Sequence, residues 1–268
     1  MRNLMLYIVD DPKTDIERVC KNLRLQVDNS LELGWDAEAI WLYASFPFEH
    51  RGVSARQVRP PARPATARAT SFYKTWCILQ ALRELPADEC VWYHDVEAYQ
   101  LVPIPLPPTT RAMAFCLYTA RDRMLVQGGS MFFSGAARAV FERVMDRLVH
   151  DRVRKDEYAL TEMVGRPEFL GWFEVLDYSW NLGDTDFELR YQLAARPIKA
   201  VHFHLDRRDH AAKFLDGKNG LGVRPLPERF VRLLARHGFA AKDGSEGADL
   251  PRERRSWLEQ LFSPRPAA

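Results

Sequence analysis

The stretch Cys90-Val91-Trp92-Tyr93-His94-Asp95-Val96-Glu97 decides the fold. Its first four residues are apolar and rich in β-formers, which is typical of a strand buried in a parallel sheet. The strand leads into two carboxylates, Asp95 and Glu97, that are separated by one position. In an open α/β sheet, ligands bind beyond the carboxyl ends of the strands, so we expect both carboxylates at a binding edge. Oxygen ligands of this kind suit Mg²⁺ or Mn²⁺, and such ions are commonly shared with substrate phosphates.

Strand and helix patterns alternate on both sides of this stretch. Residues 4–9 form an apolar run that stops at Asp10 and Asp11, and a helical spacing over 14–33 then leads to a strand pattern over 39–45. Further helices are predicted at 71–85, 136–149 and 156–164, and further strands at 112–118, 130–133 and 199–204. This order predicts an α/β fold: one domain over residues 1–268, with a mostly parallel central sheet flanked by helices.

Two segments do not follow the alternation. Residues 46–70 contain several prolines, and they also contain Arg51, Arg56, Arg59, Arg63 and Arg68. We expect a long flexible loop there, most often a solvated insertion, although its arginines could meet a diphosphate or an acidic acceptor. Beyond residue 206 the pattern predicts short basic helices near 228–237 and 252–262, and therefore a C-terminal helical extension over 225–268.

Composition excludes several classes of protein. With 47% hydrophobic and 28% charged residues among 268, the chain is expected to be globular and soluble. The net charge is only +2, from 38 basic and 36 acidic residues, so the chain as a whole has no positive field that would attract nucleic acid or an anionic membrane. No apolar run is long enough for a transmembrane segment or reads as a signal peptide. The four cysteines form no CxxC pair, which favours free thiols and a cytoplasmic location.

The acidic turn also carries a family resemblance. The order of helix 71–85, a short acidic turn, an apolar strand and His94-Asp95-Val96-Glu97-Ala98 resembles the DxD-bearing segment of the GT-A glycosyltransferases, with Glu97 in place of the second Asp. Residues 127–135, 155–161 and 201–204 are similar to later elements of that superfamily, so the resemblance covers residues 4 to 210 in outline. The pattern is nearest to the retaining glycogenin and bacterial galactosyltransferase type. It implies a single Rossmann-like GT-A domain that transfers a sugar from a UDP- or GDP-sugar to a carbohydrate, lipid-linked or small-molecule acceptor.

The same resemblance implies a divalent cation, Mn²⁺ or Mg²⁺. Its ligands would be Asp95, Glu97 and a histidine of the late strand, which is either His202 or His204. Residues i and i+2 of a strand face the same side, so both imidazoles can point at one site, and the choice between them stays open. A hydrogen-bonded histidine with no ligand role is an equally ordinary interpretation for at least one of them.

Asp156 and Glu157 are the candidate catalytic residues, because they resemble the acidic helix start that lies beside the transferred sugar in retaining relatives. One of them would orient a sugar hydroxyl or stabilise an oxocarbenium-like transition state. In an inverting enzyme the same region would supply a general base. The helix dipole favours acidic residues at this position in any protein, so a purely structural role stays possible. The residues that the resemblance places at the donor are Val9, Asp10, Asp11, Lys74 and Asp95.

Two other functions remain open. A sugar nucleotidyltransferase shares the sheet and the metal, but it normally carries a Gly-rich basic loop after the first strand, where this chain has Val9-Asp10-Asp11-Pro12. A non-catalytic relative that binds a nucleotide sugar or a carbohydrate would keep the fold and lose turnover. A zinc hydrolase built on His202 and His204 is less well supported, because zinc sites usually recruit a further nearby ligand.

Overall fold

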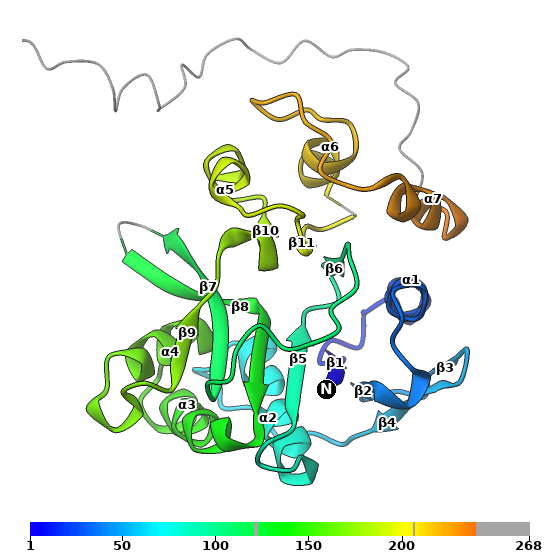
Figure 1. The fold of residues 1–268 in the computed structure, drawn as a ribbon. Coiled ribbons are helices and arrows are strands. Elements are labelled where there is room, and N and C mark those ends of the chain that lie inside the picture. Colours follow the sequence, from blue (N-terminus) through cyan, green and yellow to red (C-terminus); the bar gives the residue numbers. More distant parts are fainter. Residues whose placement is uncertain (121–122, 206, 240–268) are drawn as a thin grey trace, which may run out of the picture.

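The computed structural model describes residues 1–120, 123–205 and 207–239 (Figure 1). Its centre is an eight-stranded sheet with the order β3-β4-β2-β1-β5-β8-β7-β9. A second sheet of three strands has the order β10-β11-β6 and lies above the first in Figure 1. The strands are β1 (Arg2–Tyr7), β2 (Ile40–Ala44), β3 (Glu49–His50), β4 (Val53–Gln57), β5 (Cys90–His94), β6 (Ala98–Gln100), β7 (Met113–Ala120), β8 (Arg123–Ser134), β9 (Phe173–Val175), β10 (Leu182–Gly183) and β11 (Ala200–His202).

Helices cover both faces of the large sheet, and the alternation of side chains along the strands decides which helix each residue meets. On β1, Leu4 packs into the core shared with α2, α3 and α4, whereas its neighbour Met5 packs into the core shared with α1. On β5, Val91 and Tyr93 join the first of these cores and Trp92 faces away from it. The helices are α1 (Ile16–Glu32), α2 (Ala69–Glu84), α3 (Arg138–His150), α4 (Asp156–Val164), α5 (Phe187–Leu193), α6 (Arg208–Leu215) and α7 (Glu228–Arg236).

The predicted α/β fold is confirmed, but the sheet is more mixed than we expected. The run β4-β2-β1-β5 is parallel throughout. Strand β8 is antiparallel to both of its neighbours, β5 and β7, and β3 is antiparallel to β4. Strands β7 and β8 are consecutive in the chain, as are β3 and β4, and consecutive strands that lie side by side with a short link pair antiparallel.

The prediction of one long loop over residues 46–70 is wrong for its first half, which forms the hairpin of β3 and β4. Arg51 and Gly52 connect the two strands, and both have positive φ, 49° and 82°. A two-residue hairpin loop requires this conformation, and Arg-Gly is a weak sequence signal for it. Val53 is buried in the core and β4 pairs with β2, so the hairpin extends the large sheet.

Other boundaries also differ from the prediction. The late strand ends at His202, so His204 lies beyond it, and β8 is much longer than the predicted 130–133 and includes Gly128 and Gly129. Of the expected extension over 225–268, the structure describes α7, while the helix expected at 252–262 lies outside the described residues. None of the helices in the described ranges is both long and apolar enough to cross a bilayer.

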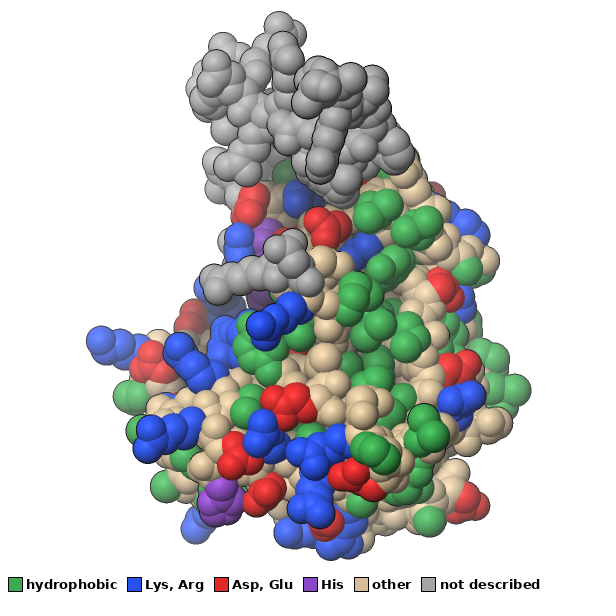
Figure 2. All heavy atoms as spheres, turned by 90° about the vertical axis from the view of Figure 1, so that its left-hand side faces the viewer, with side chains coloured by type: hydrophobic (Ala, Val, Ile, Leu, Met, Phe, Trp, Pro, Cys, Tyr) green, Lys and Arg blue, Asp and Glu red, His purple; other side chains and the backbone are tan. Residues whose placement is uncertain are grey.

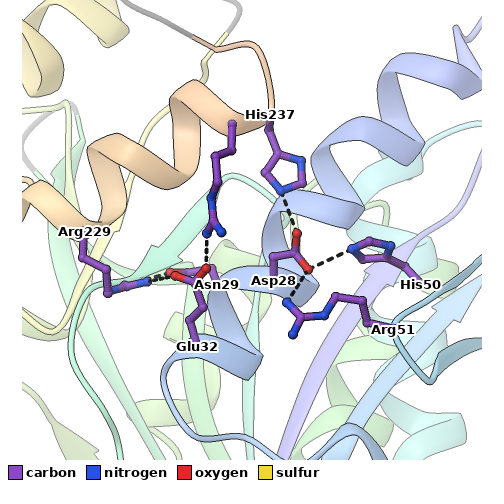
Figure 3. A network of polar contacts seen from close by, with 8 residues as sticks. Asp28, Asn29, Glu32, His50, Arg51, Arg229 and His237 are labelled. Carbon is purple, nitrogen blue, oxygen red and sulfur yellow. Dashed lines mark hydrogen bonds and ion pairs between the residues drawn. The ribbon is translucent and has the colours of Figure 1, made fainter.

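Helix α7 is held against α1 by a network of polar contacts (Figure 3). Asp28 on α1 accepts hydrogen bonds from Arg51 at 3.1 Å and lies within 2.8 and 2.9 Å of ring nitrogens of His50 and His237. Burial alone would raise the pKa of Asp28, but these three partners hold it below its usual value. One helical turn further on, Glu32 pairs with Arg229 and Arg236 of α7.

Candidate functional site

A cavity of about 650 Å³ opens at the carboxyl ends of β1 and β5. Its walls come from the turn after β5, the amino-terminal ends of α2 and α4, and the end of β11. The residues that the sequence placed at the site line this cavity, with Val9 as the exception: they are Asp10, Asp11, Lys74, Asp95, Glu97, Asp156, Glu157, His202 and His204. Val9 instead packs beside the core under α1, and its backbone N–H donates to Ser45 Oγ at 2.9 Å.

Backbone hydrogen bonds hold the turn after β5 that carries the acidic motif. The N–H of Asp95 donates to the carbonyl of Gly129 on β8 at 2.9 Å, and the N–H of Ala98 donates back to the carbonyl of Asp95 at 2.9 Å. Strand β6 therefore begins at Ala98, directly after the motif. Because β6 pairs antiparallel with β11, His202 lies opposite Ala98. The register of the small sheet thus brings the late histidines to the acidic turn.

Two acid–imidazole pairs result from this register. His202 Nε2 lies 3.9 Å from Asp95 Oδ2, and His204 Nδ1 lies 3.9 Å from Glu97 Oε1. Phe203 between them is fully buried on the opposite side, as the alternation of a strand predicts. The expectation that both imidazoles face one site is confirmed, since both line the cavity.

Two glycines of β8 make room for these side chains. A Cβ on Gly129 would overlap the imidazole of His202 and would lie 3.1 Å from Asp95 Oδ2. A Cβ on Gly128 would lie 2.9 Å from Lys74 Nζ and 3.1 Å from Asp156 Oδ2. The cavity can therefore hold its polar groups this close to the sheet only because neither residue carries a side chain.

Lys74 of α2 and Asp156 of α4 form a buried ion pair. Lys74 Nζ lies 2.5 Å from Asp156 Oδ2, and the two side chains are 13% and 5% exposed. Lys74 Nζ also donates to the carbonyl of Gly128 at 3.2 Å. Burial alone would lower the pKa of Lys74, but the charges of Asp156, Asp95 and Glu157 raise it above its usual value. Lys74 is therefore a charged member of the site, whereas a lone lysine on a helix is ordinarily solvated.

The electrostatic field of the site keeps Asp95 ionised and His202 neutral. Burial opposes the charge on Asp95, but Lys74 and a hydrogen bond from the Tyr93 hydroxyl hold the pKa of its carboxyl below the usual value. For His202, burial is the largest influence and lowers the pKa, against the opposing effect of Asp95. His94 is fully buried, which lowers its pKa to about 4. A neutral imidazole leaves one ring nitrogen free to act as an acceptor or a ligand.

These residues suit a hard divalent cation in kind, and their present geometry offers two ligands at a time. An ion with donors at about 2.1 Å can be shared by two atoms as much as about 4.2 Å apart, so each acid–imidazole pair spans an acceptable distance. Within the described residues, however, no three His, Cys, Asp or Glu side chains converge around one point. A shared ion would therefore require one side chain to turn, or substrate oxygens to complete its coordination.

Tyrosines that the sequence analysis did not single out also shape the cavity. At the end beside β1, the hydroxyl of Tyr73 donates to Asp10 Oδ1 at 2.8 Å. At the other end, the hydroxyl of Tyr93 donates to Asp95. Tyr93 lies two positions before Asp95 on an extended chain, so strand alternation alone predicts that the two side chains share a side. Tyr73 directly precedes Lys74, and no local pattern marks it.

Comparison of the sequence with family models finds no match, and comparison with curated proteins finds none either. Comparison of the structure finds glycosyltransferases. The galactosyltransferase LgtC, in complex with donor and acceptor sugar analogues, matches with a TM-score of 0.54 at 13% identity over 96% of this chain and 100% of that one. A glycosyltransferase involved in the glycosylation of the major capsid of PBCV-1 matches with a TM-score of 0.52 at 16% identity, over 75% of this chain and 92% of that one.

A third solved structure, the glycosyltransferase GlyE of Streptococcus pneumoniae TIGR4, matches with a TM-score of 0.52 at 10% identity, over 87% of this chain and 60% of its own. At these identities the similarity concerns the fold. The GT-A glycosyltransferase fold that the sequence resemblance predicted is thereby confirmed, including its likeness to the galactosyltransferase LgtC.

Proposed function

We propose that the protein transfers a sugar from a nucleotide-sugar donor to an acceptor hydroxyl in the 650 Å³ cavity. The observation that carries this proposal is the convergence, in one cavity at the carboxyl edge of a glycosyltransferase fold, of an acidic turn, two histidines and a buried Lys–Asp pair. Fold alone does not imply activity, so the proposal rests on these side chains. LgtC, which has the same fold, was solved with donor and acceptor sugar analogues.

The donor would lie along the cavity with its nucleoside toward Asp10 and Asp11. Its diphosphate would face the amino-terminal end of α2, where Thr70 and Ser71 line the cavity. This helix has neither a side-chain cap nor an acidic residue in its first turn, so its free N–H groups and its dipole favour an anion. A donor with a UDP or GDP moiety fits this arrangement.

Asp95, Glu97 and one of the two histidines would hold Mn²⁺ or Mg²⁺ beside that diphosphate. Such an ion neutralises the negative charge that builds up on a departing diphosphate. The protein's own contribution is to keep Asp95 ionised and His202 neutral, the protonation states in which both side chains act as ligands. Tyr93 fixes the orientation of the Asp95 carboxylate by donating a hydrogen bond to it.

Asp156 and Glu157 would act on the sugar from the start of α4. Lys74 fixes Asp156, while Tyr118 donates to Glu157 Oε2 at 2.8 Å, so neither carboxylate turns freely. An oriented carboxylate can hold a sugar hydroxyl and can stabilise positive charge near the anomeric carbon. We favour retention of configuration, with Asp156 in this role. The acceptor would be a carbohydrate, a lipid-linked sugar or a small molecule.

Release of nucleoside diphosphate from a panel of UDP- and GDP-sugars tests the proposal. We expect release with Mn²⁺, its loss in chelator, and a fall of about a hundredfold in Asp95→Asn. Asp88→Asn is the matched control, because Asp88 is exposed on the turn after α2 and loses the same charge. Donor binding without release would favour the non-catalytic relative. Equal rates in the two variants would show that Asp95 has no role in the reaction. Full activity in chelator would show that the reaction does not need a metal. The cytoplasmic location stays a prediction.

A further inference from the structure

A second cavity of about 370 Å³ adjoins the first, and arginines dominate its wall. It lies between the segment before α2 and the segment that joins α3 to α4. The lining residues are Arg63, Ala65, Thr66, Ala67, Arg68, Arg152 and Arg154, and none of them is acidic. Arg68 lines both cavities, so the two are contiguous.

Hydrogen bonds and one unusual backbone conformation hold the segments around this second cavity in place. The N–H of Arg68 donates to the carbonyl of Arg154 at 3.0 Å, which ties the two segments together. Arg63 Nη1 donates to the carbonyl of Ala67 at 2.6 Å and closes the loop before α2 on itself. Arg152 has φ of 58°, a left-handed conformation that is uncommon for a residue with a side chain. Strain of this kind is concentrated at functional sites.

Three of the four arginines that line the second cavity lack a counter-charge; the exception is Arg63, whose Nε lies 3.6 Å from Asp10 Oδ2. Arg68, Arg152 and Arg154 are exposed, and their side chains make no ion pair or hydrogen bond with any residue in the described part of the chain. Arg147 nearby shows the ordinary arrangement, because it pairs with both Asp151 and Glu162. Basic and acidic side chains are likewise interspersed over the lower part of the face in Figure 2 (blue and red). Several cations held together repel one another, and a bound anion relieves that repulsion.

We infer that the second cavity binds a phosphoryl group of the acceptor substrate, an inference that rests on the proposed sugar transfer. Guanidinium groups form paired hydrogen bonds with phosphoryl oxygens, and a phosphoryl dianion has enough oxygens for several of them. The position of the second cavity beside the start of α4 indicates that the phosphoryl group belongs to the acceptor. Arg154 precedes Asp156 by two residues, so a substrate anchored at Arg152 and Arg154 can extend a hydroxyl to Asp156 in the first cavity.

Pyrophosphate binding, measured by calorimetry on the full chain in the presence of chelator, tests the site. The chelator removes metal-dependent binding in the first cavity. The amino-terminal end of α2 also favours anions, so the comparison with the arginine variant decides which cavity binds. We expect saturable binding by the wild type, and an affinity at least about tenfold weaker in Arg152→Gln/Arg154→Gln. The matched control is Arg24→Gln/Arg143→Gln, which removes two exposed arginines from α1 and α3 and should bind like the wild type. No saturable binding, or equal weakening in both double variants, would overturn the inference.

A second measurement separates this inference from the proposed function. UDP or GDP with Mn²⁺ should bind Arg152→Gln/Arg154→Gln as tightly as the wild type, because the subsite belongs to the acceptor. A parallel loss of nucleotide binding would assign these arginines to the donor and overturn the inference, while the sugar-transfer proposal would stand on donor hydrolysis by the wild type. If the wild type does not hydrolyse the donor, the second cavity cannot be assigned to an acceptor substrate, even if it binds pyrophosphate.

The phosphoryl group could come from a free sugar phosphate or from a lipid-linked one. Displacement of pyrophosphate by a hexose 1-phosphate identifies the first source. Sedimentation of the wild type, but not of Arg152→Gln/Arg154→Gln, with vesicles that contain a polyprenyl phosphate identifies the second. Either result supports the inference, and failure of both contradicts the acceptor assignment.

Discussion

Replacing Gly129 with alanine tests the geometry of the site directly. The new Cβ would overlap the imidazole of His202, and it would lie 3.1 Å from Asp95 Oδ2. Gly129 does not have positive φ, so alanine causes no backbone strain and should even stabilise by about 0.4–1 kcal/mol through the unfolded state. Overpacking against the ring costs about 1–3 kcal/mol. We therefore expect the free energy of unfolding to fall by about 1–2 kcal/mol.

The measurement is a double-mutant cycle in urea with Gly129→Ala, His202→Ala and the combined variant. When the ring of His202 is absent, the added methyl group has nothing to overlap. In the His202→Ala background, Gly129→Ala should therefore be neutral or stabilising. The coupling free energy between the two positions should then be at least about 1 kcal/mol. Gly165→Ala is the matched control, because its Cβ would meet only the carbonyl of Glu162 at 3.8 Å. An equal cost of Gly129→Ala in both backgrounds would refute the placement of His202 over β8.

Three further predictions concern stability and reactivity. Asp28→Asn should lower the free energy of unfolding by about 1–2 kcal/mol at pH 7. The partners of Asp28 hold its pKa below the unfolded value of 3.8. The stability difference between the wild type and Asp28→Asn should therefore be complete above pH 3.8 and shrink as the pH falls through the folded pKa. A stability difference that does not depend on pH would contradict this prediction. Lys74→Met should cost about 3–5 kcal/mol in chemical denaturation, since Asp156 would stay buried without its partner, and adding Asp156→Leu should recover most of this loss; no recovery would count against the pair. Burial raises the pKa of the Cys77 thiol to about 12, so iodoacetamide at pH 8 should label it quickly only in denaturant, as followed by mass spectrometry.

Local patterns predicted the elements that carry the site. The buried strand before Asp95 and the helix that begins at Asp156 follow from apolar runs and from helical spacing, which depend only on neighbouring residues. The alternation of a strand also predicted that His202 and His204 share a side and that Phe203 opposes them. Topology then brought the acidic turn and the histidines together, as the family resemblance implied.

Contacts between segments that are distant in the chain could not be predicted from the sequence. The ion pair of Lys74 with Asp156 joins two helices, and no periodicity along the chain marks either partner for the other. The same holds for Tyr73, which reaches Asp10 across the cavity. The β3–β4 hairpin was missed because its turn uses Arg51 in a conformation that glycine or asparagine usually supplies.

The pairing of β6 with β11 also has a consequence for how the protein is made. Ala98 and His202 are neighbours in the small sheet, although about half of the described chain separates them in sequence. During synthesis the acidic turn therefore leaves the ribosome long before its histidine partners, and an amino-terminal fragment that ends before β10 lacks them altogether. Closing so large a loop is slow, so the cluster of acidic side chains and histidines should be among the last features of the molecule to form.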